Sequence, residues 1–455
     1  MSIMSIYKNM PPLIQNIAIS IYGFKRELKR YGGNFPNELK RIKNQEYANA
    51  EYIHNYQKEE LRKLLFAADK SEHYHLIFDR MKINLTDNPY DILKKMPILS
   101  KQELRGNEQL FQTGRSKGDM VVHTSGSTGT PLTVRMNIED FRLRMAMLER
   151  MKLRYGIDHR SRHISFVGKK ITSNNSKSFW RYNRAGHQMV MSVYNLSEEN
   201  ANAYIKAIKA FQPEMIEGYP SAISIVAKWI IDRKDSIPLK CVLVTAETLS
   251  DEQKAVMEEA FCCPIVNYYG STEGAPMITP CECGNLHVDY ESGIIEFLDD
   301  NNLPVPEGHP AKMIVTCFTT KRTPLIRYDI GDMAIVGSNK CKCGRQTRTV
   351  KMIIGRCDDV FSTPEKGYVG RLSTTLKLLP SFVRKAQIRQ IALTRFVLIL
   401  ESSQELSKEQ KDVLIHDMLD KLGHVEVEIK YTDQIPTGAN GKFRSQISLI
   451  GRDNI

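Results

Sequence analysis

Two short cysteine motifs constrain the fold of this chain more than any other feature. Cys281-Glu282-Cys283-Gly284 and Cys341-Lys342-Cys343-Gly344 are nearly identical, and His287 follows the first. Four thiolates, or three thiolates and an imidazole, can close a tetrahedral zinc site that has no open position for catalysis. The motifs predict a structural zinc ion that joins the two segments, completed by either Cys283 or His287. The alternatives are buried free cysteines or a redox pair.

The composition indicates a large globular chain in a reducing compartment. With 455 residues the chain can bury a large core and form roughly two to four domains. Its nine cysteines do not resemble a secreted disulfide framework, since several stand in close pairs suited to metal, so we expect a cytoplasmic protein. No stretch reaches the roughly 20 apolar residues needed to cross a bilayer, and no transmembrane segment is expected.

The segment 10–24 is moderately apolar. Two prolines and two amides interrupt it, Lys25-Arg26 follow it, and no small-residue cleavage site stands behind it. We interpret this segment as a packed N-terminal helix, with a signal sequence or an interfacial anchor as the alternatives.

The net charge of +12 suits an anionic partner: a nucleotide, CoA, an acidic polysaccharide precursor or a membrane surface. A solvated basic surface is the alternative explanation. No basic run is interleaved with aromatic residues, so nucleic acid is not expected as a partner.

Hydrophobic patterning predicts an α/β protein with a helical N-terminal cap. Residues 1–95 show helical periodicity, and from 120 to 350 apolar runs at 163–167, 240–245 and 264–269 alternate with helix-like stretches. Ser250 and Gln253 form a capping box that opens a helix, and Ser197 opens another.

After residue 356 the pattern changes to a small α+β unit. A strand is predicted at 391–400, followed by a helix at 407–422 that Ser407 and Gln410 cap and Gly423 ends. Apolar residues then alternate over 425–431, which predicts a half-buried strand.

One loop is dense in hydroxyls and small residues. It reads His123-Thr124-Ser125-Gly126-Ser127-Thr128-Gly129-Thr130-Pro131. Glycine lets the main chain approach an anion closely, and N–H and hydroxyl groups can donate to it. It is not a Walker A loop, because no Gly-Lys-Ser/Thr follows, and an ordinary turn is the alternative.

Four later segments change the interpretation of that loop. They are Tyr269-Gly270-Ser271-Thr272-Glu273, Tyr328-Asp329-Ile330-Gly331-Asp332, Gly355-Arg356-Cys357-Asp358-Asp359 and Pro436-Thr437-Gly438-Ala439-Asn440-Gly441-Lys442. Together the five segments resemble the adenylate-forming superfamily of acyl-CoA synthetases, most closely its phenylacetate-CoA ligase branch and the CapK-like relatives associated with capsular polysaccharide synthesis. The N-terminal stretch resembles the CapK-like subgroup through Leu13-Ile14-Gln15-Asn16, Tyr22-Gly23 and Arg30-Tyr31-Gly32.

The resemblance covers nearly the whole chain and implies two domains. A large multilayer α/β domain would span 1–355, with the helical cap over 1–95, the α/β core over 96–355 and the zinc-knuckle insertion over 279–345. A small mobile α+β lid would span 356–455 and swing between two half-reactions about a hinge near Asp358.

The resemblance also implies a nucleotide site. Thr124 to Thr130 would cradle the β- and γ-phosphates of ATP, although Thr130-Pro131-Leu132 stands where many relatives carry a lysine. Thr272 would contact the α-phosphate and Glu273 would hold Mg2+. The resemblance implies adenine-side contacts for Ala246, Glu247, Thr248, Tyr268 and Tyr269, and further nucleotide contacts for Gly270 and Ser271. Asp332 would bind the ribose hydroxyls, and Arg356 would contact ribose or phosphate.

Further roles follow from the same resemblance. Lys442 would contact the carboxylate and α-phosphate during adenylation, where a preorganised positive charge stabilises the transition state. Gly218, Tyr219 and Pro220 would line the acyl pocket. Relatives often carry a Cys-x5-His spacing that Cys281 and His287 reproduce, which would make Cys283 an extra thiol.

The sequence therefore predicts an ATP- and Mg2+-dependent ligase that activates a carboxylic acid as acyl-AMP and passes the acyl group to a nucleophile. CoA is the default acceptor in the resembled family. An amino sugar or another amine, giving an amide, is one alternative, and a non-catalytic zinc-containing nucleotide-binding protein is another.

Overall fold

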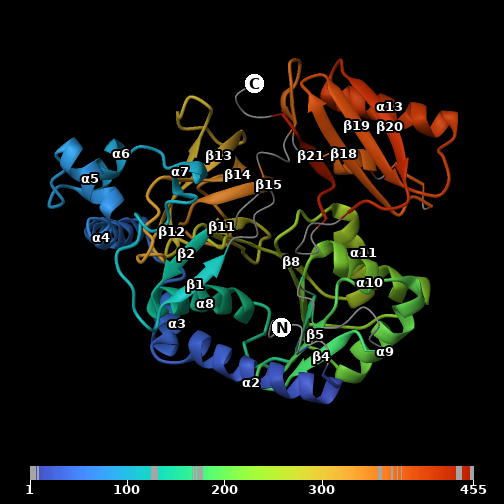
Figure 1. Ribbon diagram of the computed structural model, residues 1–455, viewed down its shortest axis with the longest axis horizontal. Helices are drawn as coiled ribbons and strands as arrows, with labels where there is room; N and C mark the ends of the chain where they lie inside the picture. The colour runs from blue at the N-terminus through green and yellow to red at the C-terminus, as the bar shows by residue number, and fades with distance from the viewer. Residues whose placement is uncertain are drawn as a thin grey trace.

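A computed structural model describes residues 7, 10–123, 132–166, 168, 171, 178–356, 361–369, 372–376, 378–380, 382–436 and 443–450. The chain forms a large N-terminal part and a smaller C-terminal part, which Figure 1 shows in orange and red at the upper right. Both parts combine helices with β-sheets, which confirms the predicted α/β class.

The N-terminal region is helical, as predicted. Its helices are α2 (Pro12–Tyr31), α3 (Phe35–Asn44), α4 (Ala50–Ala68), α5 (Glu72–Met81), α6 (Pro89–Lys95) and α7 (Lys101–Leu104). In the described part of the chain, no helix is long and apolar enough to cross a membrane. Helix α3 packs on α8 (Ile138–Leu153), and α4 packs on an antiparallel sheet through Leu61 and Leu64.

A six-stranded sheet forms one half of the large part. Its order is β4 (Trp180–Asn183), β5 (Gln188–Met191), β3 (His163–Phe166), β6 (Met215–Gly218), β7 (Cys241–Val244) and β8 (Ile265–Asn267), parallel except for β4. Helices α9 (Ala201–Phe211), α10 (Pro220–Asp232) and α11 (Asp251–Phe261) share its apolar core. The register places Phe166, Gly218, Val244 and Asn267 side by side, so these strands end at one edge of the sheet.

A seven-stranded antiparallel sheet forms the other half. Its order is β12 (Gly293–Leu298), β13 (Pro310–Cys317), β14 (Tyr328–Val336), β15 (Thr349–Arg356), β11 (Leu286–Val288), β10 (Met277–Pro280) and β9 (Tyr269–Gly270). Strands β1 (Met120–His123) and β2 (Thr133–Met136) form a separate two-stranded antiparallel sheet that packs in the same apolar core. The chain leaves the parallel sheet after Asn267 and enters the seven-stranded sheet at Tyr269, so residues 268–273 lie where the two sheets meet.

The C-terminal part is a four-stranded sheet in the order β20 (Glu426–Thr432), β19 (Arg395–Glu401), β18 (Lys385–Ala392) and β21 (Gln446–Ser448). Helix α13 (Lys408–Leu422) covers it, capped at Ser407 and ended at Gly423 as predicted. Smaller elements of this part are β16 (Phe361–Thr363), β17 (Gly367–Val369) and α12 (Ser373–Leu376).

Two sequence predictions need correction. The single strand expected over 391–400 is wrong, because β18 ends at Ala392 and β19 begins at Arg395 after a tight turn. The segment 10–24 is helical, but α2 does not bury its apolar residues: Leu13, Ile17 and Ile21 are exposed.

Candidate functional site

A cleft of about 650 Å3 lies between the two sheets and the C-terminal part. The register of the parallel strands explains one wall of the cleft, because the segments after β7 and β8 leave the sheet at the same edge. This is the edge at which α/β sheets bind ligands. The cleft brings together segments far apart in the sequence: 245–248, 267–273, Ile330 and Asp332, 353–355, 383–386 and 443–446.

Ala246, Glu247 and Thr248 line the cleft directly after β7. The Glu247 carboxylate accepts a hydrogen bond from the N–H of Ser221, in the first turn of α10, at 3.2 Å. Its other oxygen accepts from the N–H of Phe443, in the C-terminal part, at 3.1 Å. Glu247 therefore connects the two parts of the molecule across the cleft.

The segment from Gly270 to Glu273 forms a turn that Arg144 holds in place through hydrogen bonds. The Arg144 guanidinium donates to the carbonyl oxygens of Ser271 and, at 3.3 Å, Thr272. Gly274 closes the turn with φ of 95°, and a Cβ there would stand 2.6 Å from the Thr319 hydroxyl. Glycine is required at this position, and the turn is fixed by the surrounding structure.

Glu273 is buried at this turn, with 4% of its surface exposed. In the described part of the chain its Oε1 has no hydrogen-bond partner, and Lys101 Nζ lies 3.9 Å away. A buried carboxylate oxygen without a hydrogen-bond donor needs a compensating positive charge. The residue therefore fits a site for a hard cation such as Mg2+, which takes oxygen ligands.

Two neighbouring tyrosines have different surroundings. Tyr269 donates a hydrogen bond from its hydroxyl to Asp332 Oδ2, which joins β9 to β14 within the cleft. Tyr268 packs beside Met151 and Val266, and burial raises its pKa to about 12. Both line the cleft, but only Tyr269 is bonded to the carboxylate expected on the ribose side.

Asp332 and Arg356 are directly paired across β14 and β15. The resemblance implied a ribose contact for Asp332 and a ribose or phosphate contact for Arg356, and the register places their backbones opposite each other. Asp332 lines the cleft, as does Gly355 next to Arg356.

The segment predicted to line the acyl pocket lies at the end of β6. Gly218 has φ of 148°, and a Cβ there would stand 2.1 Å from the Phe166 carbonyl oxygen, so only glycine fits. Tyr219 precedes α10 and packs against the core of the parallel sheet, and Pro220 is the first residue of the helix. Among these neighbours Ser221 lines the cleft.

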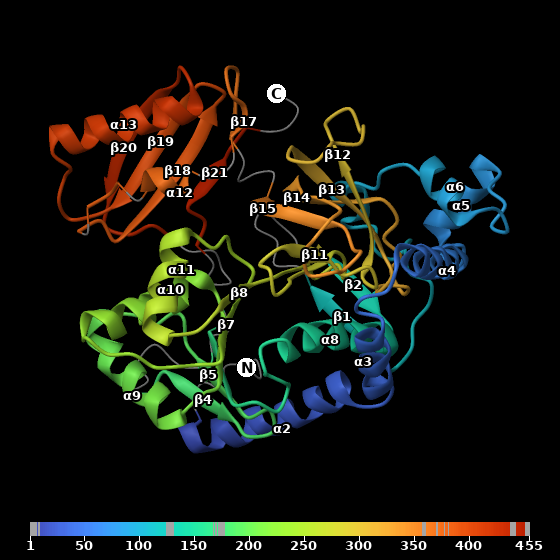
Figure 2. The same cartoon turned by 180° about the vertical axis from the view of Figure 1, so that it is seen from behind.

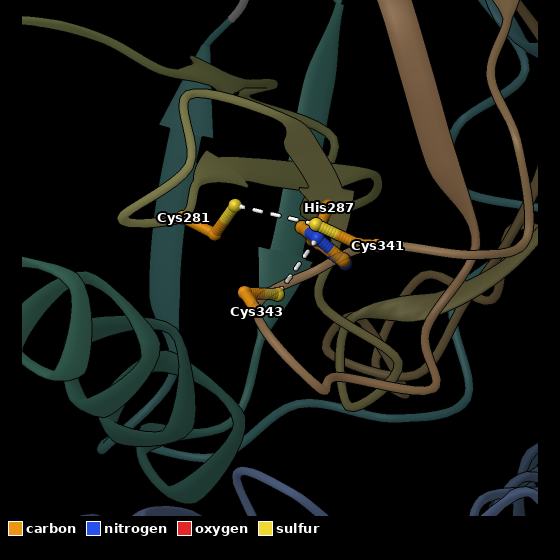
Figure 3. A group of neighbouring side chains, drawn as sticks. All are labelled: Cys281, His287, Cys341 and Cys343. Atoms are coloured by element: carbon orange, nitrogen blue, oxygen red, sulfur yellow. Dashed lines mark hydrogen bonds between the residues drawn. The ribbon is translucent and has the colours of Figure 1, made fainter.

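Four of the five predicted zinc ligands lie together. The ligand atoms of Cys281, His287, Cys341 and Cys343 are all within 4.8 Å of one another, and Figure 3 shows how their side chains converge. Cys281 Sγ lies 3.7 Å from Cys341 Sγ, and Cys343 Sγ lies 3.4 Å from His287 Nε2. Cys283 is exposed and lies outside this group.

The donor set fits a tetrahedral zinc ion. His287 Nδ1 bonds to the Thr347 hydroxyl at 2.8 Å, which orients Nε2 toward the thiols. Burial raises the pKa of Cys281 to about 11. At Cys341 burial is outweighed by hydrogen bonds from the Cys343 backbone, His287 and Asn285, which lower its pKa to about 6 and favour the thiolate.

Ion pairs hold the cysteine motifs to the turn that follows α3. Arg345, next to the second motif, bonds to Glu282 at 2.6 Å and to Glu46 at 2.8 Å. Glu46 also pairs with Arg154 at 2.7 Å. Gly284 and Gly344, which end the two motifs, have φ of 80° and 86°, so each motif closes in a turn that favours glycine.

Several predicted residues lie outside the described part of the chain. They are the phosphate loop Thr124 to Thr130, the hinge residue Asp358 and Lys442. At Arg356 only the backbone is described.

Three kinds of site residue were missed by sequence reasoning. Arg144 is a cation in the middle of α8, and no local sequence signal indicates that it bonds to the turn at Ser271 and Thr272. Lys101 lies at the start of a short helix more than 170 positions before Glu273. Arg384, Lys385 and Arg444 give the C-terminal wall of the cleft a positive character, which only the tertiary fold reveals.

Comparison with known proteins identifies relatives over the whole chain. Residues 67–314 match the AMP-binding enzyme family, and residues 361–448 match the CapK C-terminal domain. Protein CapK of Staphylococcus aureus is 29% identical over 98% of this chain and 99% of its own length. Phenylacetate-coenzyme A ligase of Thermus thermophilus is 22% identical over 88% and 97%, respectively. A solved structure of 2-hydroxyisobutyryl-CoA ligase in the postadenylation state shares the fold, with a TM-score of 0.69 and 16% identity over 90% of this chain and 92% of that one.

Proposed function

Because the chain belongs to the AMP-binding enzyme family, in its CapK-like branch, we propose that it is an adenylate-forming ligase that makes an acyl-CoA from a free carboxylic acid. In the first half-reaction a carboxylate oxygen attacks the α-phosphorus of ATP, giving acyl-AMP and pyrophosphate. In the second, the CoA thiol attacks the acyl carbon, loses its proton and displaces AMP.

One observation carries this proposal: the convergence of Glu273, Asp332 and the 246–248 segment on a single cleft whose far wall is the C-terminal part. A reaction between two anions needs them held in line and their developing charge neutralised. A buried carboxylate for a metal, a half-buried carboxylate for a ribose and a cationic wall opposite them are the parts that such a reaction requires.

Each cleft residue has a role in the proposal. Glu273 would hold Mg2+, which would neutralise charge on phosphate oxygens, and its buried Oε1, which accepts no hydrogen bond from the described residues, supports this role. Asp332 accepts hydrogen bonds from the ribose hydroxyls, and the hydrogen bond from the Tyr269 hydroxyl orients its carboxylate. Thr272 meets the α-phosphate, and the Arg144 bond to its carbonyl keeps the turn in place.

Lys442 and the phosphate loop complete the proposed site. Lys442 directly precedes Phe443, whose N–H contacts Glu247 at the cleft, and this neighbourhood supports a role for its ammonium group at the reacting carboxylate. Thr124 to Thr130 bind the β- and γ-phosphates. The region around Asp358 is the hinge about which residues 356–455 move relative to 1–355.

The zinc ion has a structural role in this proposal. Cys281, His287, Cys341 and Cys343 would hold it, and a four-ligand site has no position open for substrate. It would tie the loop between β14 and β15 to the β10–β11 hairpin, which fixes the sheet that carries Asp332.

The acceptor is tested by supplying the purified enzyme with ATP, Mg2+ and a panel of carboxylic acids, together with either CoA or a set of amines that includes amino sugars. The proposal predicts an acyl-CoA thioester, detected by mass spectrometry, with CoA as sole acceptor. Formation of an amide with an amine, and no thioester, would contradict CoA as the acceptor but leave adenylation intact.

A further inference from the structure

Helix α2 carries a stripe of exposed apolar side chains. Leu13, Ile17, Ile21, Phe24 and Leu28 follow one another at spacings of three or four residues, so they lie on one face of the helix. Ile14 and Tyr22 widen the stripe, and each of these seven residues keeps 46–70% of its surface exposed. Monomeric soluble proteins rarely leave a contiguous apolar surface of this kind without a partner.

The opposite face of α2 is polar and fixes the helix on the protein. Gln15 is buried and accepts from Arg181, Asn16 accepts from the Tyr182 N–H at 2.9 Å, and Arg26 donates to Gln188 at 3.0 Å. Gly23 allows the close contact, since a Cβ there would stand 2.1 Å from the side chain of Asn183. The outward direction of the apolar stripe is therefore set by specific contacts.

The exposed charges beside the stripe are positive. Lys25 and Lys29 are exposed on α2, and Lys40 and Lys43 are exposed on the adjoining α3. The one carboxylate of α2, Glu27, is largely buried, with 19% of its side chain exposed, and lies 3.7 Å from Arg26. The chain as a whole carries a net charge of +12.

The stripe lies far from the cleft. In both views α2, in blue, runs along the lower edge of the molecule, while the C-terminal part, in orange and red, lies at the upper edge (Figures 1 and 2). A flat surface can contact α2 without closing the cleft or restraining the C-terminal part.

We propose that α2 docks this protein on an anionic phospholipid bilayer. An amphipathic helix lies in the plane of the interface with its apolar face in the headgroup and acyl boundary, while lysines contact anionic headgroups. The apolar stripe and the lysines match these two layers. The docking is peripheral, and it does not depend on which acid or acceptor the cleft uses.

A second copy of the chain fits this face less well. The α2 of a second copy offers Lys25 and Lys29 only the largely buried Glu27, which is already paired with Arg26, and the second copy brings another net charge of +12. An anionic bilayer supplies opposite charge over the whole face, and this complementarity decides between the two occupants.

The test is flotation of the full chain with vesicles made of equal parts phosphatidylcholine and phosphatidylglycerol, and with vesicles of phosphatidylcholine alone. The wild type is expected to float with the anionic vesicles. The partition coefficient of the triple variant Ile17→Ser/Ile21→Ser/Phe24→Ser onto anionic vesicles is expected to be roughly 30-fold lower than that of the wild type, because the variant lacks three apolar side chains that would enter the bilayer. For Lys25→Gln/Lys29→Gln, the partition coefficient onto anionic vesicles is expected to fall by roughly 10-fold or more, because two contacts to anionic headgroups are removed.

Matched controls change the same chemistry elsewhere. Leu76→Ser/Leu303→Ser/Val413→Ser removes three equally exposed apolar residues, and Lys95→Gln/Lys408→Gln removes two exposed lysines. Both are expected to float like the wild type. All variants are expected to keep wild-type melting temperature and vesicle-free adenylation, since none of the changed residues lines the cleft.

Three results would overturn the proposal. One is that the wild type does not float with the anionic vesicles even at low salt. Another is equal flotation of the wild type and a folded α2 variant. The third is a dimer in sedimentation velocity that the triple α2 variant dissociates, without vesicle binding by the wild type, which would assign the face to a second copy.

Discussion

The Glu247 carboxylate accepts a hydrogen bond from the Phe443 N–H at 3.1 Å, across 196 positions of sequence. Its second oxygen accepts a hydrogen bond from the Ser221 N–H at the start of α10. The N-terminus of a helix therefore fixes the same carboxylate that contacts the C-terminal part. The bond involves the residue directly after Lys442. It therefore couples the orientation of the C-terminal part to the segment proposed to enter the cleft.

Glu247→Ala is expected to slow adenylation by roughly 10-fold or more, because a hydrogen bond to a charged group contributes about 1.5–3 kcal/mol and Phe443 loses its acceptor. Glu247→Gln keeps an acceptor oxygen and is expected to lose less. The measurement is acid-dependent exchange of pyrophosphate into ATP. Glu259→Ala, an exposed change on α11, is the control, and a wild-type rate in Glu247→Ala would argue against the coupling.

Cys341→Ser is expected to abolish stoichiometric zinc and to lower the melting temperature by roughly 5 °C or more, because the ion closes a site between two segments. Cys283→Ser is expected to retain both, since this exposed thiol lies outside the group. Elemental analysis and thermal melting measure the two effects. A wild type purified without any zinc, or zinc loss in Cys283→Ser alone, would contradict the assignment.

Glu273→Gln is expected to reduce exchange of pyrophosphate into ATP by roughly 100-fold or more, since it removes a buried charge at the proposed Mg2+ site. The protein should still fold, because glutamine has nearly the same shape. Glu252→Gln changes another carboxylate of the cleft and serves as the control. If both variants exchanged at similar rates at all Mg2+ concentrations, Glu273 would have no role in holding the metal.

Acid stability should depend on Glu217. Burial favours its neutral form, but Lys152 at 3.8 Å, His163 at 3.9 Å and a hydrogen bond from Ser165 outweigh this and lower its pKa to about 2, below the ordinary value of 4.5. The carboxylate therefore stabilises the fold above pH 4.5, and this contribution is lost as the pH falls toward 2. It amounts to about 2 kcal/mol, less than a fully buried group would give, because 28% of the side chain is exposed.

The melting temperature of Glu217→Gln is thus expected to lie below that of the wild type at neutral pH, and the difference should narrow as the pH falls from 4.5 toward 2. Glu214→Gln is the matched control, since the Glu214–Lys240 pair is largely exposed and contributes little. A difference that is the same at pH 7 and pH 3 would show that the ionisation of Glu217 does not stabilise the fold.

Local signals predicted the individual elements well. The caps at Ser250 and Ser407 and the terminating Gly423 are short-range features, and the structure confirms all three. The turn at Leu393-Thr394 was missed because it contains no glycine, proline, asparagine or aspartate, so the strand run looked continuous. Periodicity showed that α2 is a helix, but it does not tell which face a helix turns to the protein.

The site is predictable only where its residues are adjacent in sequence. The turn from Tyr269 to Glu273 and the cysteine motifs are contiguous: the metal-binding chemistry of the cysteines follows from residue type and spacing, whereas the roles expected in the turn follow from the family resemblance. Arg144, Lys101 and the bond between Glu247 and Phe443 depend on long-range packing, for which a single sequence has no signal. Residue type alone left Cys283 and His287 open as the fourth ligand; the Cys-x5-His spacing of relatives favoured His287, and the structure places His287 in the cysteine group.

The central claim is tested most directly by carboxylate-dependent exchange of pyrophosphate into ATP, with Mg2+ and no acceptor, across aryl, acyl, hydroxy and amino acids. We expect exchange with one class of acid in the wild type, and a loss of roughly 100-fold or more in Lys442→Ala with zinc content and melting temperature unchanged. Folded, zinc-loaded wild type that gives no exchange with any acid would contradict adenylation. Equal exchange in Lys442→Ala would remove Lys442 from the reaction.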